Sequence, residues 1–204
     1  IVYLARMRGG INLLCECLRI LNWKQGGMRD VTSCQFYFVG PQVGCKLDKD
    51  QTYRSLRQDQ VCNRIPGMHW ITLKGPTTRA IQLLQSLSTN PSIREFYPLS
   101  FVLPEDERLL FEHALTVSDS QVFILKPSKG SQGKGIVLAL RDQLQSKCYE
   151  MKNQLFHDGN SAPFIVQHYI SQPHTLRGYK YDLRLYVVMT SVYPLQCWVY
   201  KDGL

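Results

Sequence analysis

A loop rich in glycine and lysine, at residues 127–135, has the composition of a phosphate-binding segment. An apolar run at residues 123–125 leads into Lys126, and the loop then carries three glycines and two further lysines before Ile136. Glycines let backbone N–H groups approach an anion closely, and lysines neutralise phosphate charge. A strand, this loop and a return strand would form a hairpin flap over a nucleotide. An ordinary hairpin with solvated lysines fits the same composition, so the loop alone leaves both interpretations open.

Two common phosphate motifs do not match this loop. The Walker pattern requires Gly-Lys followed by Ser or Thr at the start of a helix, whereas Lys134 is followed by Gly135 and a β-prone run. The dinucleotide pattern requires a third glycine where Leu138 stands. The loop therefore predicts a flap between two strands.

A second candidate is a row of charged residues at every other position, Lys180, Asp182 and Arg184. Side chains alternate along a strand, so these three are expected on one face and the apolar residues between them on the other, in a core. The row could orient a cation or a ribose hydroxyl and contact phosphates. A salt-bridge ladder on a solvated sheet face is the alternative.

The elements that must position these residues follow from hydrophobic periodicity and from Gly and Pro breaks. We expect helices at residues 11–21, from 76 to 87, from 105 onward and at 141–151. We expect strands at residues 35–39, 70–73, 99–103, 122–126, 136–140, 164–169, 181–190 and 196–200, and a polar loop at 44–64. This order predicts an α+β or mixed α/β fold with antiparallel strands.

Composition limits the class of protein. The net charge of +8 and the pI of about 9.2 favour polyanionic partners, although a solvated basic surface explains them equally well. The seven cysteines form no CxxC pair, which indicates free thiols in a reducing compartment such as the cytosol. No apolar run is long enough to span a bilayer and no signal peptide is evident, so no membrane insertion is expected. The sequence begins with Ile1, and we interpret it as a piece of a longer protein.

Taken in order, the motifs resemble the tubulin tyrosine ligase-like family of ATP-grasp ligases. The segments that carry the resemblance are residues 63–67, 71–74, 126–136, 165–170, 178–184 and 200–204. The match is strong from Asn63 to the end and weak before it. The resemblance implies an ATP-grasp-like fold with an N-terminal α/β domain at 1–62, a central domain at 63–170 and the first strands of a C-terminal domain at 171–204.

The resemblance also implies a role for individual residues. Those expected at the ATP phosphates are Lys74, Lys126, Gln132, Gly133, Lys134 and Gly135. Those expected at adenine are Gln167, through its amide to the base's amino group, with His168, Tyr169 and Ile170 as the hinge. Lys180, Asp182 and Arg184 would line the nucleotide or acceptor side, with Lys180 and Arg184 as the catalytic cations.

The implied function is ATP-dependent addition of an amino acid, glutamate first, to glutamates of acidic tubulin tails through an acylphosphate. A glycylase or tyrosine ligase, or a truncated non-catalytic ATP- or microtubule-binding protein, is the alternative, and nucleic-acid binding rests on charge alone. Leu73 and Gly75 depart from the Arg and Asp usual in the family. The family's Mg²⁺-binding acids and Asn would lie beyond Leu204, so we expect no metal ligand and no turnover from these residues alone. The implied location is cytoplasmic and cytoskeletal, with the cilium and basal body as candidates.

Overall fold

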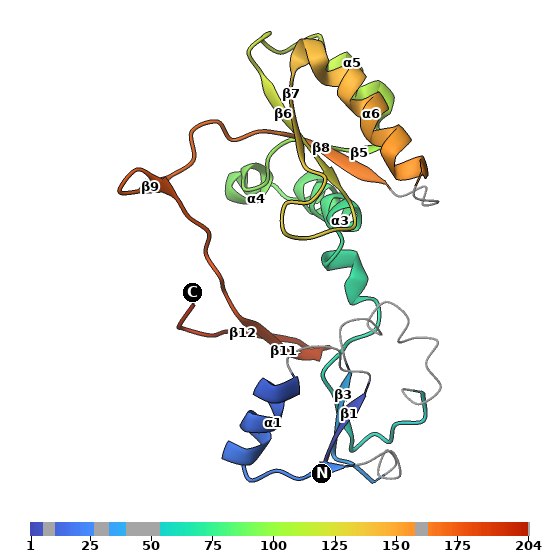
Figure 1. Cartoon of the computed structure of the whole chain (residues 1–204), viewed down its shortest axis with the longest axis vertical. Helices are drawn as coiled ribbons and strands as arrows, with labels where there is room; N and C mark the ends of the chain where they lie inside the picture. The colour runs from blue at the N-terminus through green and yellow to red at the C-terminus, as the bar shows by residue number, and fades with distance from the viewer. Residues whose placement is uncertain (6–10, 27–32, 40–53, 158–162, 204) are drawn as a thin grey trace. The chain divides into compact units, whose positions relative to one another are not determined.

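A computed structural model describes residues 1–5, 11–26, 33–39, 54–157 and 163–203 (Figure 1). The chain divides into two compact units, residues 1–169 and residues 170–204, and each is described by itself. The first unit contains two four-stranded sheets, and the second contains two hairpins. Within the described ranges, no helix combines the length and the apolar character needed to cross a membrane.

The first sheet is small and wholly parallel. Its strand order is β2 (Gln25–Gly26), β1 (Val2–Ala5), β3 (Phe36–Val39) and β4 (Val61–Cys62). Parallel neighbours require a crossover, and α1 (Ile11–Ile20) lies in the connection from β1 to β2. The helix expected at 11–21 and the strand expected at 35–39 are confirmed. Of the loop expected at 44–64, residues 44–53 lie outside the described residues.

The second sheet is antiparallel and carries the glycine-rich loop. Its strand order is β5 (Ser100–Leu103), β8 (Phe164–His168), β6 (Val122–Pro127) and β7 (Val137–Leu140). All four strands were expected from the sequence. β5 is buried along its whole length and β8 along all but its last residue, which explains why both are apolar runs rather than alternating ones.

One face of this sheet packs against two helices, α5 (Glu107–Ala114) and α6 (Leu144–His157), which lie near the strands in Figure 1. The core between them consists of Phe101, Leu103, Leu110, Ala114, Phe123, Leu125, Ala139, Leu144, Cys148, Met151, Phe164 and Val166. The helix expected from residue 141 begins as a single 3₁₀ turn, η4 (Arg141–Gln143), and continues as α6.

The helix α3 (Lys74–Leu87) contacts β5 and β8, and its Gly75 lies close to Val102. The strand expected at 70–73 is wrong, because these residues fall in the 3₁₀ helix η3 (Met68–Ile71) and the approach to α3. A turn at Gly67 (φ +80°) starts this 3₁₀ helix, and Trp70 donates its N–H to the carbonyl of Gly67. Local hydrogen bonds therefore replace the strand pairing. A short helix, α4 (Pro91–Glu95), follows α3.

The second unit is built from two hairpins. β9 (Thr175–Leu176) pairs with β10 (Tyr179–Lys180), and β11 (Val187–Val192) pairs with β12 (Leu195–Val199). The two residues between β9 and β10, Arg177 and Gly178, both have positive φ, as a type I′ hairpin turn requires.

The single strand expected at 181–190 is wrong for residues 181–186, which lie between β10 and β11. The alternating apolar residues do not face a core: Tyr181, Leu183, Leu185 and Val187 are 43–74% exposed. Within the described residues, this stretch pairs with no neighbouring strand. Its last residue, Tyr186, accepts one backbone hydrogen bond from Tyr200 at 2.9 Å, but a segment without a partner strand lacks a ladder of such bonds, so periodicity alone does not make it a strand.

Candidate functional site

Three polar side chains lie in a row across the second sheet, one from each of the neighbouring strands β5, β8 and β6. Ser100 stands directly opposite Gln167 in the β5–β8 register, and Lys126 lies diagonally across from Gln167 in the β8–β6 register. Because side chains alternate along each strand, all three belong to the face opposite the α5–α6 core. Lys126 Nζ donates to Gln167 Oε1 at 2.8 Å, and Gln167 Nε2 donates to Ser100 Oγ at 2.8 Å.

The flap leaves the sheet at the end of β6 and returns in β7. Residues 122–137 contain three lysines and no acid, so the flap is positively charged. Gln132, Gly133 and Gly135 all have positive φ, between 60° and 74°, and a Cβ on Gly135 would lie 3.0 Å from the ring of Pro127. Glycine is needed there because the left-handed conformation and the close approach both disfavour a side chain. Residues 129–136 are exposed.

The start of α3 is joined to the flap through Ser128. The N–H of Lys74 donates to the Ser128 carbonyl at 3.2 Å, and the N–H of Gly75 donates to the buried Ser128 Oγ at 2.9 Å. Lys74 Nζ donates to the carbonyl of Gly130 at 2.9 Å. Pro76 has no N–H, and Thr77 donates its own to Leu73. The first backbone donors of this helix are therefore used within the protein, and its contribution to anion binding must come from the Lys74 side chain.

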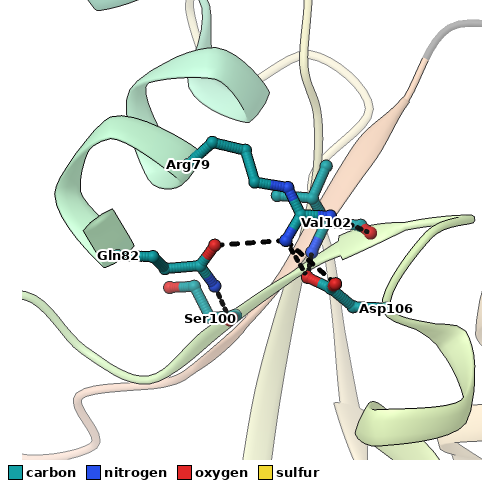
Figure 2. Close-up of polar contacts among 5 residues, drawn as sticks. All are labelled: Arg79, Gln82, Ser100, Val102 and Asp106. Atoms are coloured by element: carbon teal, nitrogen blue, oxygen red, sulfur yellow. Dashed lines mark hydrogen bonds and ion pairs between the residues drawn. The ribbon is translucent and has the colours of Figure 1, made fainter. Parts of the chain in front are cut away.

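A second polar group fastens α3 to β5 on the same face, as Figure 2 shows. Arg79 Nη1 donates to both oxygens of Asp106, at 2.6 and 2.9 Å. Asp106 Oδ2 also accepts from the Val102 N–H at 2.8 Å, and Gln82 Nε2 donates to the Ser100 carbonyl at 2.8 Å. These contacts hold the backbone of Ser100 from the helix side.

The hinge residue next to Gln167 faces the other way. His168 lies on the core side, where its Nε2 is 2.9 Å from Nε2 of His113 on α5 and its ring meets Phe123 edge-on. Burial, and then the neighbouring His113, lower the pKa of His168. The N–H of His168 donates to Leu99 and that of Tyr169 to Val122. Both hinge amides are thus engaged within the sheet.

The remaining sequence-predicted site residues belong to the second unit. Ile170 is 58% exposed, and Lys180, Asp182 and Arg184 are exposed. Lys180 is the last residue of β10, whereas Asp182 and Arg184 follow it outside any strand, so the expected single strand face is not formed.

Ser100, Ser128, Arg79 and Asp106 were not predicted as site residues. For Ser100 the sequence held one signal, a polar residue within an apolar strand. Ser128, Arg79 and Asp106 depend on contacts with residues 27 or more positions away. No local pattern encodes such contacts.

No three His, Cys, Asp or Glu side chains gather into a potential metal site in the described part of the chain. The six cysteines in this described part are free thiols.

Comparison with known proteins gives the family. A profile described as "Tubulin-tyrosine ligase family" matches residues 51–204, about three quarters of the chain. The chain belongs to the tubulin-tyrosine ligase family. It is 32% identical over 205 residues to the mouse protein "Tubulin polyglutamylase TTLL11", covering 98% of this chain and 26% of that protein. It is 33% identical over 156 residues to human "Tubulin monoglutamylase TTLL4", covering 76% of this chain and 12% of that protein. The chain thus spans about a quarter or less of the length of these two relatives.

Solved structures agree on the fold. The C-terminal domain from K. lactis Pby1, described as "an ATP-grasp enzyme", superposes with a TM-score of 0.60 at 20% identity, covering 99% of this chain and 57% of that one. D-cycloserine synthetase DcsG superposes with a TM-score of 0.50 at 14% identity, covering 83% and 59%. The expected mixed α/β, ATP-grasp-like fold is confirmed, and the antiparallel sheet with its flap is part of it.

Proposed function

We propose that the chain binds ATP on the sheet face that carries Ser100, Gln167 and Lys126, beneath the flap. The observation that carries this proposal is the meeting of Lys126 with Gln167, which places a cation and an amide side by side on adjacent strands. An amide can read the edge of a base, and a lysine next to it can neutralise the phosphates. The residues proposed to contact ATP in this unit are Lys74, Lys126, Gln132, Gly133, Lys134, Gly135, Gln167, His168 and Tyr169.

The anchoring of the lysines supports a phosphate-binding role. Lys126 is held by the Gln167 oxygen and Lys74 by the Gly130 carbonyl, so both ammonium groups are placed before a ligand arrives. Preorganised cations stabilise charge on a transferring phosphoryl group without the cost of reorganisation during the reaction. For the second unit, we propose the roles that the family resemblance implies: Lys180, Asp182 and Arg184 on the nucleotide or acceptor side, and Ile170 as a hinge residue.

The reaction that this family membership supports is ATP-dependent ligation of glutamate to glutamates of tubulin tails. A tail carboxylate oxygen attacks the γ-phosphorus and ADP leaves. The amine of glutamate then attacks the acyl carbon, phosphate leaves, and a proton is lost from nitrogen. The net charge of +8 suits an acidic acceptor, because opposite charges steer the encounter.

The proposal extends to cofactor, location and domains. Mg²⁺ would neutralise the phosphates. A tubulin acceptor implies a cytoskeletal location, including cilia and basal bodies. We retain the division into domains at 1–62, 63–170 and 171–204.

The replacement Lys126→Ala tests the site. A hydrogen bond to a charged group contributes about 1.5–3 kcal/mol, so affinity for a fluorescent ATP analogue should fall roughly 10- to 150-fold. Lys152→Ala is the matched control, because Lys152 lies on α6, on the other side of the sheet, and pairs at 3.8 Å with Glu107. Thermal unfolding checks that both variants fold. Unchanged affinity in Lys126→Ala would remove this lysine from the site.

A labelling assay decides between amino acids. Tubulin incubated with a longer protein containing this chain should incorporate radiolabelled glutamate in preference to glycine or tyrosine. ATP binding without incorporation of any of the three would favour a non-catalytic nucleotide- or microtubule-binding protein.

A further inference from the structure

The hydrogen bonds from Lys126 to Ser100 can run in only one direction. A lysine ammonium donates and never accepts, so the Gln167 atom beside Lys126 Nζ must be the oxygen, at 2.8 Å. The amide nitrogen of Gln167 therefore points at Ser100 Oγ, also at 2.8 Å. Ser100 must accept this bond, and its own hydroxyl proton goes to the Pro98 carbonyl at 2.7 Å. Each link fixes the polarity of the next.

Ser100 is a rigid acceptor because its surroundings hold it on both sides. Its carbonyl accepts from Gln82 on α3, as Figure 2 shows, and its strand pairs with β8 directly opposite Gln167. Ser100 is 3% exposed and Gln167 is 5% exposed. Water therefore cannot replace the Ser100 hydroxyl if it is removed, and the amide nitrogen of Gln167 would lose a partner in a buried place.

We propose that Ser100 is a positioning residue that maintains the purine specificity of the nucleotide site by anchoring Gln167, an inference that rests on the proposed ATP-binding function. With its nitrogen held by Ser100, Gln167 presents a carbonyl oxygen, which has two lone pairs. One accepts from Lys126, and the other can accept from the exocyclic amine at position 6 of adenine. A purine with a carbonyl at position 6 would set two acceptors against each other. Lys126 thus sets the direction of the Gln167 amide, and Ser100 holds the amide in that direction and so favours a 6-amino purine without touching the base.

The test compares ATP with inosine triphosphate, which has the same sugar and phosphates and carries oxygen at position 6. Binding of each is measured by calorimetry on the full 204-residue chain. Wild type should bind ATP at least tenfold more tightly than inosine triphosphate. Ser100→Ala should reduce that ratio at least fivefold, mainly by weakening ATP. Ser100→Thr keeps the hydroxyl and should restore the ratio.

The ratio separates positioning from general loosening of the fold. A variant that only disturbs the sheet or the phosphate contacts weakens both nucleotides alike and leaves the ratio unchanged. An unchanged ratio in Ser100→Ala, or a Ser100→Thr variant that behaves like Ser100→Ala, would overturn the inference. Failure of wild type to bind either nucleotide would instead overturn the proposed function. Far-UV circular dichroism on each variant confirms that the chain is folded in every comparison.

Discussion

Replacing Asp106 with alanine should destabilise the first unit more than any exposed acidic substitution nearby. The Asp106 carboxylate accepts from Arg79 on α3 and from the Val102 N–H on β5, and it stands immediately before α5. Its side chain is 12% exposed, whereas that of Arg79 is 39% exposed. One small side chain therefore joins three elements, and its removal leaves two donors without their acceptor.

The magnitude follows from how each donor can be satisfied afterwards. Val102 is 4% exposed, so its N–H stays buried and unpaired, at a cost of about 1–3 kcal/mol. The partly exposed Arg79 guanidinium can turn to solvent, and loss of such an ion pair costs about 0–1 kcal/mol. Together the loss should be roughly 1–4 kcal/mol. For a chain of this size that corresponds to a drop in Tm of about 2–16 °C.

Urea unfolding followed by far-UV circular dichroism measures the loss. The control is Glu105→Ala, because Glu105 is exposed and immediately precedes Asp106; it should change the free energy of unfolding by less than about 0.5 kcal/mol. A result for Asp106→Ala within 0.5 kcal/mol of this control would refute the reasoning. It would mean that the Val102 N–H finds another partner, or that the carboxylate does not hold it in solution.

Three further predictions concern pH, thiol reactivity and packing. Burial lowers the pKa of His168 below the unfolded value of about 6.5, so the unfolded chain binds the extra proton and stability should fall as pH drops below 6.5. His168→Gln should flatten urea midpoints between pH 7 and 5, whereas exposed His174→Gln should not; parallel profiles for wild type and His168→Gln would contradict this. Burial raises the pKa of Cys148 to about 12, so N-ethylmaleimide at pH 8 should label it at least tenfold more slowly than exposed Cys197, by mass spectrometry; equal rates would disprove it. A Cβ on Gly75 would lie 2.9 Å from a buried serine hydroxyl, so Gly75→Ala should cost about 1–3 kcal/mol, and an unchanged Tm would speak against it.

The antiparallel second sheet could be predicted from the sequence because its strands have strong local signals. A hairpin is predicted without any knowledge of distant residues, because an apolar run before Lys126 leads into the glycine-rich loop and a second apolar run at 137–140 follows it. The apolar run at 164–168 is fully consistent with a strand buried on both faces.

The two wrong strands show where periodicity is insufficient. Residues 70–73 are β-prone, yet local turn hydrogen bonds after Gly67 lead them into a 3₁₀ helix. Residues 181–186 alternate as a strand should, yet they have no partner strand in the described part of the chain. Strand formation depends on a neighbour, which a local pattern does not contain.

The residues of the candidate site were likewise only partly predictable from the sequence. Lys126 and Gln167 were predicted through a resemblance that covers both motifs. Ser100 was not, because its importance comes from a register that sets it opposite a residue 67 positions away. The local sequence does not specify that register. Nor does it specify the hydrogen bond from Gly75 to Ser128, which are 53 positions apart.

The contacts that α3 and Asp106 make along β5 limit how the proposed acceptor peptide could bind at this strand. β5 is the outer strand of its sheet on that side, and outer strands usually invite strand addition or aggregation. Here the Ser100 carbonyl accepts from Gln82, the Val102 N–H donates to Asp106, and the Val102 carbonyl accepts from the Asp106 N–H at 2.9 Å. These rungs are already occupied, so a flexible tail cannot dock by extending the sheet at β5. For the acidic acceptor proposed above, charge reversals along the tail should therefore matter more at β5 than its capacity to form a strand.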